Sequence, residues 1–285
     1  MCQTMMSSLR KPLPSELQVI KAPPTWRVID FISDLHLQAA EPETFAAWQR
    51  YLETTRADAV FILGDLFEVW VGDDATSYSG SDSTSNTGPG HPSFEAVCAG
   101  VLKLAAERFP LYFMHGNRDF LVGTEFCEST GVTLLSDPCI FEFCGERWAL
   151  SHGDALCLAD VDYQAFRKTV RSPAWQTGFL AKPLVERRDI ARNLREQSTA
   201  RKAAVTTYAD ADESATLQLL TTAGARHLIH GHTHRPASHV LPGGLRRHVL
   251  SDWDLNAVPA RAQVFRLSLA EPGTASIARI PLEQA

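Results

Sequence analysis

Short apolar runs, each bounded by polar residues, recur along the chain and constrain its fold more than any other feature. They lie at residues 28–33, 59–64, 111–116, 148–153 and 227–231. Runs of this length indicate strands that are buried on both faces. Stretches with helical spacing, such as 43–54 and 94–108, lie between several of these runs. This alternation of strands and helices predicts an α/β fold.

The segments around these strands predict one large unit with an insertion. Residues 1–25 are polar and contain prolines, which favours a flexible tail ahead of a core at 26–285. Residues 73–92 are rich in Ser, Gly, Thr and Asp, which predicts a mobile surface loop. From about 161 to 207 the helical periodicity is interrupted only by prolines. We therefore expect a helical cap inserted between two core strands.

The composition is typical of a soluble globular protein, with 45% hydrophobic and 21% charged residues. No apolar run approaches the roughly 18 residues of a membrane-spanning helix, and no signal-peptide core precedes Trp26, so we expect a cytoplasmic protein. The six cysteines form no CxxC pair, which argues against a zinc ribbon or a disulfide framework. The net charge of −6 argues against a surface built for nucleic acid.

The expected cap departs from this acidic average. Between Tyr163 and Lys202 there are ten Lys or Arg against three Asp or Glu, a local charge of +7 that leaves −13 for the rest of the chain. Such an asymmetry suggests an anionic partner for the cap.

Five short polar motifs follow predicted strands, where ligands of α/β sheets gather. In the first, SDLHL, an extended backbone would direct Asp34 and His36 to one face, a spacing that suits two ligands of one ion. In the second, GDLFEVW, Asp65 follows its strand directly, and Gly64 permits a tight turn. A carboxylate at this position can bridge two cations.

The third motif, HGNRD, offers Asn117 as a neutral oxygen ligand and Arg118 as a fork of donors that matches phosphate geometry. Asp119 is placed to orient this arginine. The fourth motif, SHGD, puts His152 after a strand, with Asp154 as a possible supporting partner.

The fifth motif, HGHTHRP, repeats the spacing of the first with His232 and His234. Any one of these motifs in isolation is more simply a surface cluster or a chance triplet, but five that all follow strands are not expected by chance. Imidazole, carboxylate and amide ligands without a thiolate favour Mn²⁺, Fe²⁺ or Zn²⁺ over calcium or a structural zinc. Of these we prefer manganese.

The order of the motifs resembles that of the calcineurin-like metallophosphoesterase superfamily, D-x-H, GD, GN, H and G-H-x-H. The resemblance implies an αββα sandwich, in which two packed mixed sheets are flanked by helices. It also implies two divalent metal ions with a bridging hydroxide as the nucleophile. The implied ligands are Asp34, His36, Asp65 and His234 for one ion, and Asp65, Asn117, His152 and His232 for the other.

One residue departs from the superfamily pattern. The superfamily usually has a histidine after the asparagine, which can protonate a leaving alkoxide, whereas this chain has Arg118. Arginine cannot act as an acid near neutral pH. This favours a leaving group that needs no proton, such as a phosphate monoester, and hence cleavage of a diphosphate.

Longer strings resemble the UDP-2,3-diacylglucosamine diphosphatase family of lipid A synthesis over about residues 27–255. They are GDLFEVWVGDD (64–74), HGNRDFLVG (115–123), SHGDALC with DYQAFR (151–167) and LIHGHTHRPA (228–237). This resemblance implies hydrolysis of UDP-2,3-diacylglucosamine to UMP and 2,3-diacylglucosamine 1-phosphate, by attack on the α-phosphorus.

The same resemblance implies which residues act. Catalytic groups would be Asp65, Asn117 and Arg118, and substrate contacts would be Asn117, Arg118, Asp160 and His232. On the cap, Ser198 matches a family contact, while the following TARKAAVT departs from the family pattern and Lys202 is a plausible substitute.

The implied substrate is a lipid-linked nucleotide sugar, and the implied location is peripheral attachment to the cytoplasmic face of the inner membrane. We expect neither a nucleic-acid partner nor an obligate protein partner. Apolar cap residues would shelter two acyl chains, while basic ones meet diphosphate or anionic headgroups. The simpler interpretation is a basic amphipathic helix pair packed on the core. The apolar residues are Trp175, Phe179, Leu180, Leu184, Val185, Ile190 and Leu194.

Two alternatives to this function remain open. One is a broader phosphodiesterase or nucleotide diphosphatase of the same superfamily, against which an apolar cap argues. The other is a non-catalytic scaffold that keeps the fold, which should lack several ligands, whereas here none is missing. A nuclease is disfavoured by the acidic body and by an aromatic content of 9% without an evident stacking surface.

Overall fold

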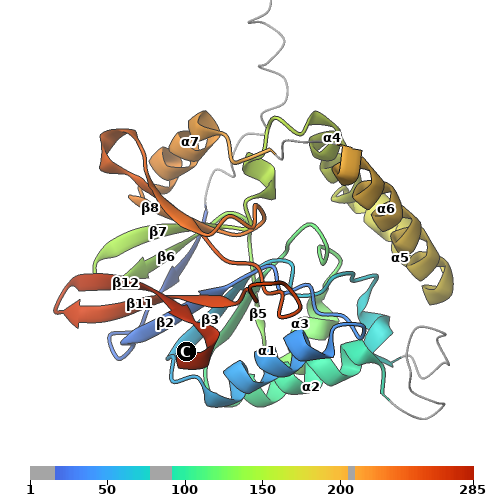
Figure 1. The fold of residues 1–285 in the computed structure, drawn as a ribbon, viewed down its shortest axis with the longest axis horizontal. Helices are drawn as coiled ribbons and strands as arrows, with labels where there is room; N and C mark the ends of the chain where they lie inside the picture. The colour runs from blue at the N-terminus through green and yellow to red at the C-terminus, as the bar shows by residue number, and fades with distance from the viewer. Residues whose placement is uncertain (1–16, 78–91, 205–208) are drawn as a thin grey trace, which may run out of the picture.

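The computed structural model describes residues 17–77, 92–204 and 209–285. In these ranges the chain forms two six-stranded mixed sheets that pack face to face, with helices on both outer faces (Figure 1). This arrangement confirms the predicted αββα sandwich. Among the described helices, none combines the length and the apolar character needed to cross a bilayer.

The first sheet contains the strands that carry three of the five motifs. Its order is β12 (Thr274–Pro281), β11 (Gln263–Glu271), β2 (Val28–Ile32), β3 (Ala59–Leu63), β4 (Leu111–Met114) and β5 (Thr133–Leu135). From β2 to β5 the strands are parallel, so their carboxyl ends lie at one edge. Helices α1 (Pro42–Thr54), α2 (Phe94–Ala106) and α3 (Thr124–Thr130) cover its outer face.

The second sheet carries the remaining two motifs. Its order is β1 (Gln18–Lys21), β6 (Cys139–Phe143), β7 (Glu146–Ser151), β8 (His227–His230), β10 (Arg246–Val249) and β9 (Ala237–Val240). Strands β7 and β8 are parallel, so the fourth and fifth motifs also follow neighbouring strand ends. Helix α7 (Glu213–Ala223) packs on the outer face of this sheet.

The apolar runs are continuous because the strands are buried on both faces. In β3, Ala59, Phe61 and Leu63 pack against the facing sheet, while Val60 and Ile62 pack against the helical layer. Alternate residues of one strand therefore belong to two separate cores, and a polar residue would be unfavourable at either position.

The segment predicted as a cap contains three helices, α4 (Val161–Val170), α5 (Pro173–Leu180) and α6 (Leu184–Ala204), and we refer to these helices as the cap. It lies along one side of the sandwich (Figure 1). The prolines mark helix starts, because Pro173 is the first residue of α5 and Pro183 directly precedes α6. The apolar cap residues divide in two, since Phe179 and Leu184 are buried in the core while Leu180 and Val185 are exposed. The simple packing interpretation therefore accounts for only part of the apolar surface.

Two predicted boundaries were wrong within the described residues. The expected flexible tail at 1–25 contains strand β1, which pairs in parallel with β6 at the edge of the second sheet. The expected loop at 73–92 begins with a 3₁₀ helix, Asp73–Ser77. Asp73 accepts hydrogen bonds from the backbone of Gly123 and Phe126, both at 2.9 Å, so tertiary contacts fix this segment. Residues 1–16 and 78–91 lie outside the described ranges.

Candidate active site

The predicted ligands lie in the loops that follow β2, β3, β4, β7 and β8. Backbone hydrogen bonds hold these loops to one another. The amides of Asp34 and His36 donate to the carbonyls of Gly64 and Asp65 at 3.1 and 3.0 Å, and the amide of Gly231 donates to the carbonyl of His152 at 2.9 Å. Between the two sheets, the amide of His232 donates to Asp34 Oδ2 at 2.9 Å, so loops from both sheets meet at one place.

The backbone at the ligands is left-handed rather than extended. Six described non-glycine residues have positive φ, and five of them are predicted ligands, namely Asp34, His36, Asp65, His232 and His234. The prediction that an extended backbone aligns Asp34 with His36 was therefore wrong, and tight turns bring the two side chains together instead. Left-handed backbone is uncommon outside glycine, although Asp and His adopt it more readily than most residues, and such conformations cluster at functional sites.

Three predicted ligands of the first ion form a tight group. His36 Nε2 lies 3.3 Å from His234 Nε2, which lies 3.2 Å from Asp34 Oδ1. The donor atoms of these three residues all fall within 4.8 Å of one another. Two imidazole nitrogens and a carboxylate oxygen in this arrangement suit a transition-metal cation.

The predicted ligands of the second ion lie beside this group. Asn117 Oδ1 lies 3.1 Å from His152 Nε2 and 2.8 Å from His232 Nδ1. Donor atoms of Asp34, Asp65 and His152 also fall within 4.8 Å of one another. All seven predicted ligands therefore converge on one region.

Asp65 lies between the two groups. Its Oδ2 is 4.0 Å from His36 Nε2, and its Oδ1 is 3.8 Å from His152 Nε2. The Oδ1 atom also accepts a hydrogen bond of 2.8 Å from the backbone amide of Arg118, which fixes the orientation of the carboxylate. One carboxylate thus offers an oxygen to each side.

Two glycines allow the loops to approach this closely. Gly64 has a φ of +91°, and a Cβ atom there would lie 2.5 Å from the ring of His152. At Gly116 a Cβ atom would lie 2.0 Å from Asp65 Oδ1 and 2.3 Å from the Asp65 amide nitrogen. Any larger residue at Gly116 would therefore displace Asp65.

The charges of the site perturb one another strongly. Burial raises the pKa of Asp34, but neighbouring histidines, His234 foremost, outweigh this effect and hold it below its ordinary value. Burial lowers the pKa of His152, but Asp65 and Asp34 outweigh it and raise the value to about 9. Burial, together with His152, lowers the pKa of His232 to about 3. Shifts in opposite directions within one cluster are typical of functional sites.

Asp119 does not orient Arg118 as predicted. Its buried carboxylate accepts hydrogen bonds from the backbone amides of Leu66 and Gly116, at 2.7 and 2.8 Å, and so ties the loop after β3 to the loop after β4. Burial and the charge of Asp65 raise its pKa to about 7. Asp119 therefore supports Asp65 rather than the arginine.

The guanidinium of Arg118 instead faces Glu68, a residue that the sequence analysis did not select. Arg118 Nη1 lies 3.7 Å from Glu68 Oε1, and His36 Nδ1 lies 2.8 Å from Glu68 Oε2. Burial raises the pKa of Glu68, but His36 and Arg118 outweigh it and lower the value to about 2. A carboxylate embedded in the apolar string LFEVW was the signal that could have identified it.

Asp154 joins the cap to the site loops. It is fully buried and bonded to the Tyr163 hydroxyl, while Arg167 Nε donates to it at 2.8 Å. Arg171, the residue that directly follows α4, donates a hydrogen bond of 2.7 Å to the carbonyl of Gly116 beside Asn117. Helix α4 is thereby fixed next to the predicted ligands.

The predicted substrate contacts of the cap are only partly described. Asp160 caps α4, where its side chain accepts a hydrogen bond of 3.1 Å from the amide of Tyr163. The Tyr163 ring stacks on His232 at a centroid distance of 5.9 Å, so this end of α4 adjoins the ligands. The side chains of Ser198 and Lys202 lie outside the described residues.

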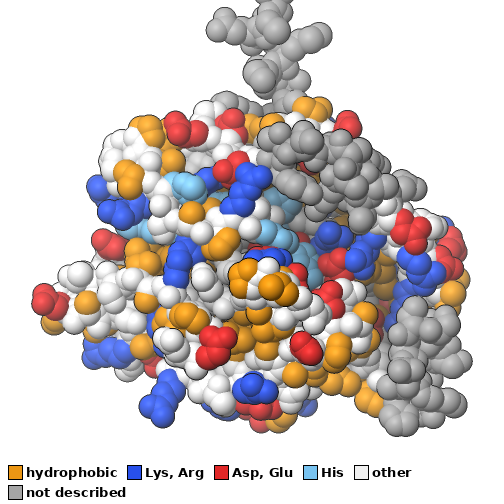
Figure 2. Space-filling model, in the orientation of Figure 1, with side chains coloured by type: hydrophobic (Ala, Val, Ile, Leu, Met, Phe, Trp, Pro, Cys, Tyr) orange, Lys and Arg blue, Asp and Glu red, His pale blue; other side chains and the backbone are white. Residues whose placement is uncertain are grey.

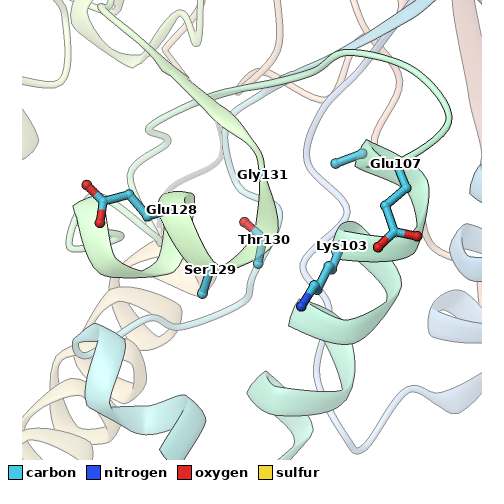
Figure 3. A pocket seen from close by; sticks show the side chains of 7 residues that line it. Lys103, Glu107, Glu128, Ser129, Thr130 and Gly131 are labelled. Atoms are coloured by element: carbon cyan, nitrogen blue, oxygen red, sulfur yellow. The ribbon is translucent and has the colours of Figure 1, made fainter.

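Histidine side chains reach the molecular surface in the region where the predicted ligands converge. Figure 2 shows histidine side chains near the middle of the face, between the two halves of the sandwich and close to Lys and Arg side chains. A separate hollow between α2 and α3 contains none of the predicted site residues (Figure 3). It is lined by Lys103, Ala106, Glu107, Glu128, Ser129, Thr130 and Gly131.

The fold and the cluster of carboxylate, imidazole and amide groups define a metallophosphoesterase. The chain belongs to the calcineurin-like phosphoesterase family, whose sequence profile matches residues 27–236. Its relatives there include the UDP-2,3-diacylglucosamine hydrolase of Chromobacterium violaceum, 46% identical over 234 residues that cover 79% of this chain and 90% of that protein. The UDP-2,3-diacylglucosamine hydrolase of Ralstonia nicotianae is 41% identical over 261 residues, covering 86% of this chain and 92% of that protein.

Proposed function

We propose that this protein is a UDP-2,3-diacylglucosamine diphosphatase, which hydrolyses its substrate to UMP and 2,3-diacylglucosamine 1-phosphate. The observation that carries the proposal is the 46% identity to a UDP-2,3-diacylglucosamine hydrolase along 90% of that protein. The convergence of seven ligand side chains supports it, because a scaffold that had lost activity would not need to retain all of them.

We further propose the ligand sets of the two ions. One set is Asp34, His36, Asp65 and His234, and the other is Asp65, Asn117, His152 and His232. The position of Asp65, with one oxygen near each histidine group, supports its role as the shared ligand. When bound to these residues, two divalent cations, for which we propose Mn²⁺, would lower the pKa of a water molecule and neutralise charge on phosphoryl oxygens.

Arg118 then has a positioning role at the phosphate. Its amide is held by Asp65, so its side chain begins beside the shared ligand, and its planar fork can bind two phosphate oxygens. It remains charged and donates no proton to the leaving group. This suits a sugar phosphate, which leaves as a phosphate monoester.

We propose that the cap binds the lipid part of the substrate and contacts the membrane. Val161, Phe166, Leu180 and Val185 on the cap helices are exposed, so apolar side chains are available there to contact an apolar partner. The basic residue Lys182 lies just before α6 and Arg192 lies on it, with 40% and 53% of their side chains exposed. Apolar and basic side chains together suit peripheral attachment to an anionic leaflet, such as the cytoplasmic face of the inner membrane. Asp160, Ser198 and Lys202 are the proposed cap contacts of the polar headgroup.

An isotope experiment tests the reaction. Protein treated with EDTA should be inactive, and Mn²⁺ should restore release of UMP from UDP-2,3-diacylglucosamine. In ¹⁸O-water the label should appear in UMP, whereas label in the lipid phosphate would refute attack on the α-phosphorus. Turnover of bis-p-nitrophenyl phosphate without turnover of the lipid substrate would favour the broader phosphodiesterase.

A further inference from the structure

Glu68 is a nearly buried carboxylate that belongs to neither proposed ligand set. It lies three residues after Asp65, in the segment between β3 and the 3₁₀ helix at Asp73–Ser77, and only 8% of it is exposed. A buried charge is costly unless it is paired, so its partners indicate why it is present.

The partners of Glu68 come from three separate parts of the fold. His36 follows β2, Arg118 follows β4 and Arg195 belongs to cap helix α6. Their nitrogens lie 2.8 Å from Oε2 for His36 and 3.7 Å from Oε1 for Arg118, and Arg195 Nη2 donates a close hydrogen bond to Oε1. Glu68 therefore contacts a proposed ligand of the first ion (His36), the arginine proposed to bind the substrate phosphate (Arg118) and a cap residue (Arg195).

The contact with His36 determines how that imidazole is presented. His36 Nδ1 lies 2.8 Å from Glu68 Oε2, and the opposite nitrogen, Nε2, lies 3.3 Å from His234 Nε2. A carboxylate on one ring nitrogen fixes the tautomer and the ring orientation, and it makes the other nitrogen a better metal ligand.

The contact with Arg195 is one of several that hold α6 to the core. Near the start of the helix, Arg187 is buried and donates to the carbonyl of Val71 and to Asp74. Arg188 pairs with Glu95, in the first turn of α2, at 3.4 Å. Arg195 lies two turns further along α6, and its pairing with Glu68 joins this helix to a residue that contacts His36.

We propose that Glu68 is a positioning residue that holds His36 toward the first ion and Arg118 and Arg195 beside it. The proposal rests on the proposed function, because it assigns a role within the same site. Glu68 contacts one proposed metal ligand, His36, and two arginines, and we assign it no direct contact with the substrate. Its removal should weaken metal binding through His36 and substrate binding through the two arginines.

The test compares Glu68→Gln with Glu95→Gln, which breaks a different ion pair of the same helix. The first readout is the Mn²⁺ concentration that gives half of the maximal rise in melting temperature, starting from metal-free protein. We expect Glu68→Gln to raise this concentration by about tenfold to a hundredfold, the usual effect of removing the partner of a metal-bound histidine. Glu95→Gln should change it by less than about twofold, because Glu95 pairs with Arg188 rather than with a proposed metal ligand.

The second readout separates the two roles of Glu68. Arg195→Gln should raise KM and leave Mn²⁺ binding unchanged, whereas Glu68→Gln should change both. Glu68→Asp keeps the negative charge on a side chain that is one methylene shorter. Its Mn²⁺ binding and its KM should therefore lie between those of the wild type and Glu68→Gln. This variant replaces Glu68→Gln in the test if Glu68→Gln does not fold.

Three outcomes distinguish the possibilities. Wild-type Mn²⁺ binding and KM in folded Glu68→Gln would overturn the inference. An equal loss of Mn²⁺ binding in Arg195→Gln would also overturn it, because the effect would then come from the cap. If Glu68→Gln binds Mn²⁺ more weakly than the wild-type protein, but the wild-type protein does not hydrolyse the lipid substrate, the positioning role is supported and the proposed function is refuted.

Discussion

Replacing Gly116 with alanine adds one methyl group at the closest approach of two site loops. The new Cβ would lie 2.0 Å from Asp65 Oδ1 and 2.3 Å from the Asp65 amide nitrogen. Because the second contact is with backbone, rotation of the Asp65 side chain cannot relieve the overlap. The loop after β3 has to move relative to the loop after β4.

The size of this movement sets the expected loss of activity. Real Cβ atoms essentially never come closer than 3.0 Å to another heavy atom, so Asp65 has to withdraw by about 1 Å. A misplacement of about 1 Å in a catalytic group lowers the rate by about a hundredfold. This corresponds to about 2.7 kcal/mol in the activation barrier.

The assay measures kcat for UMP release at saturating Mn²⁺, together with the melting temperature. Gly100→Ala is the matched control, because a Cβ on Gly100 of α2 meets no atom within 4 Å. The control should retain wild-type kcat and gain about 0.5–1 kcal/mol in stability, as glycine-to-alanine changes within helices do. Folded Gly116→Ala with kcat within twofold of wild type would refute the argument that this glycine fixes the position of Asp65.

Three further predictions concern other side chains. Arg118→His should lower kcat/KM for the lipid substrate at least about tenfold, since a charged hydrogen bond contributes about 1.5–3 kcal/mol, and full activity would contradict the argument from the leaving group. Arg247 donates to Asp210 and lowers its pKa to about 2 from 3.8, so this pair should stabilise the fold above pH 4 and lose its effect as the pH falls toward 2. Denaturant unfolding of Asp210→Asn should show a loss of about 1 kcal/mol at pH 7, a value reduced for the exposure of Asp210, and an unchanged difference at pH 2 would contradict the assignment. Arg187→Met should lower the free energy of unfolding by about 1–3 kcal/mol, because it leaves the Val71 carbonyl without its partner, and wild-type stability in urea would refute this.

The elements that the sequence predicted best are those with strong local patterns. The run AVFIL at 59–63 reads as a buried strand from its composition alone, and β3 occupies the same residues. Strand β1 was missed because its four residues, QVIK, lie in a polar and proline-bearing segment, and their pairing with β6 is a contact between residues about 120 positions apart. Local composition carries no information about such a partner.

The same distinction between local pattern and long-range contact applies to the candidate site. Residue types such as those of Asp34 and His36 follow from the motifs, but the left-handed turns that bring them together depend on hydrogen bonds to the neighbouring loop at Gly64 and Asp65. The supporting carboxylates were likewise misassigned or missed. Asp119 bonds to backbone amides rather than to Arg118, and the partners of Glu68 come from distant segments.

The sequence by itself determined which segments would be buried strands and which ligand types would follow them, because both depend on the identities of adjacent residues. Only the tertiary structure decided how loops from two sheets meet, which carboxylate supports which ligand and how the cap reaches the site. These depend on contacts across tens to hundreds of residues, where burial and the pairing of charges determine the favourable arrangement.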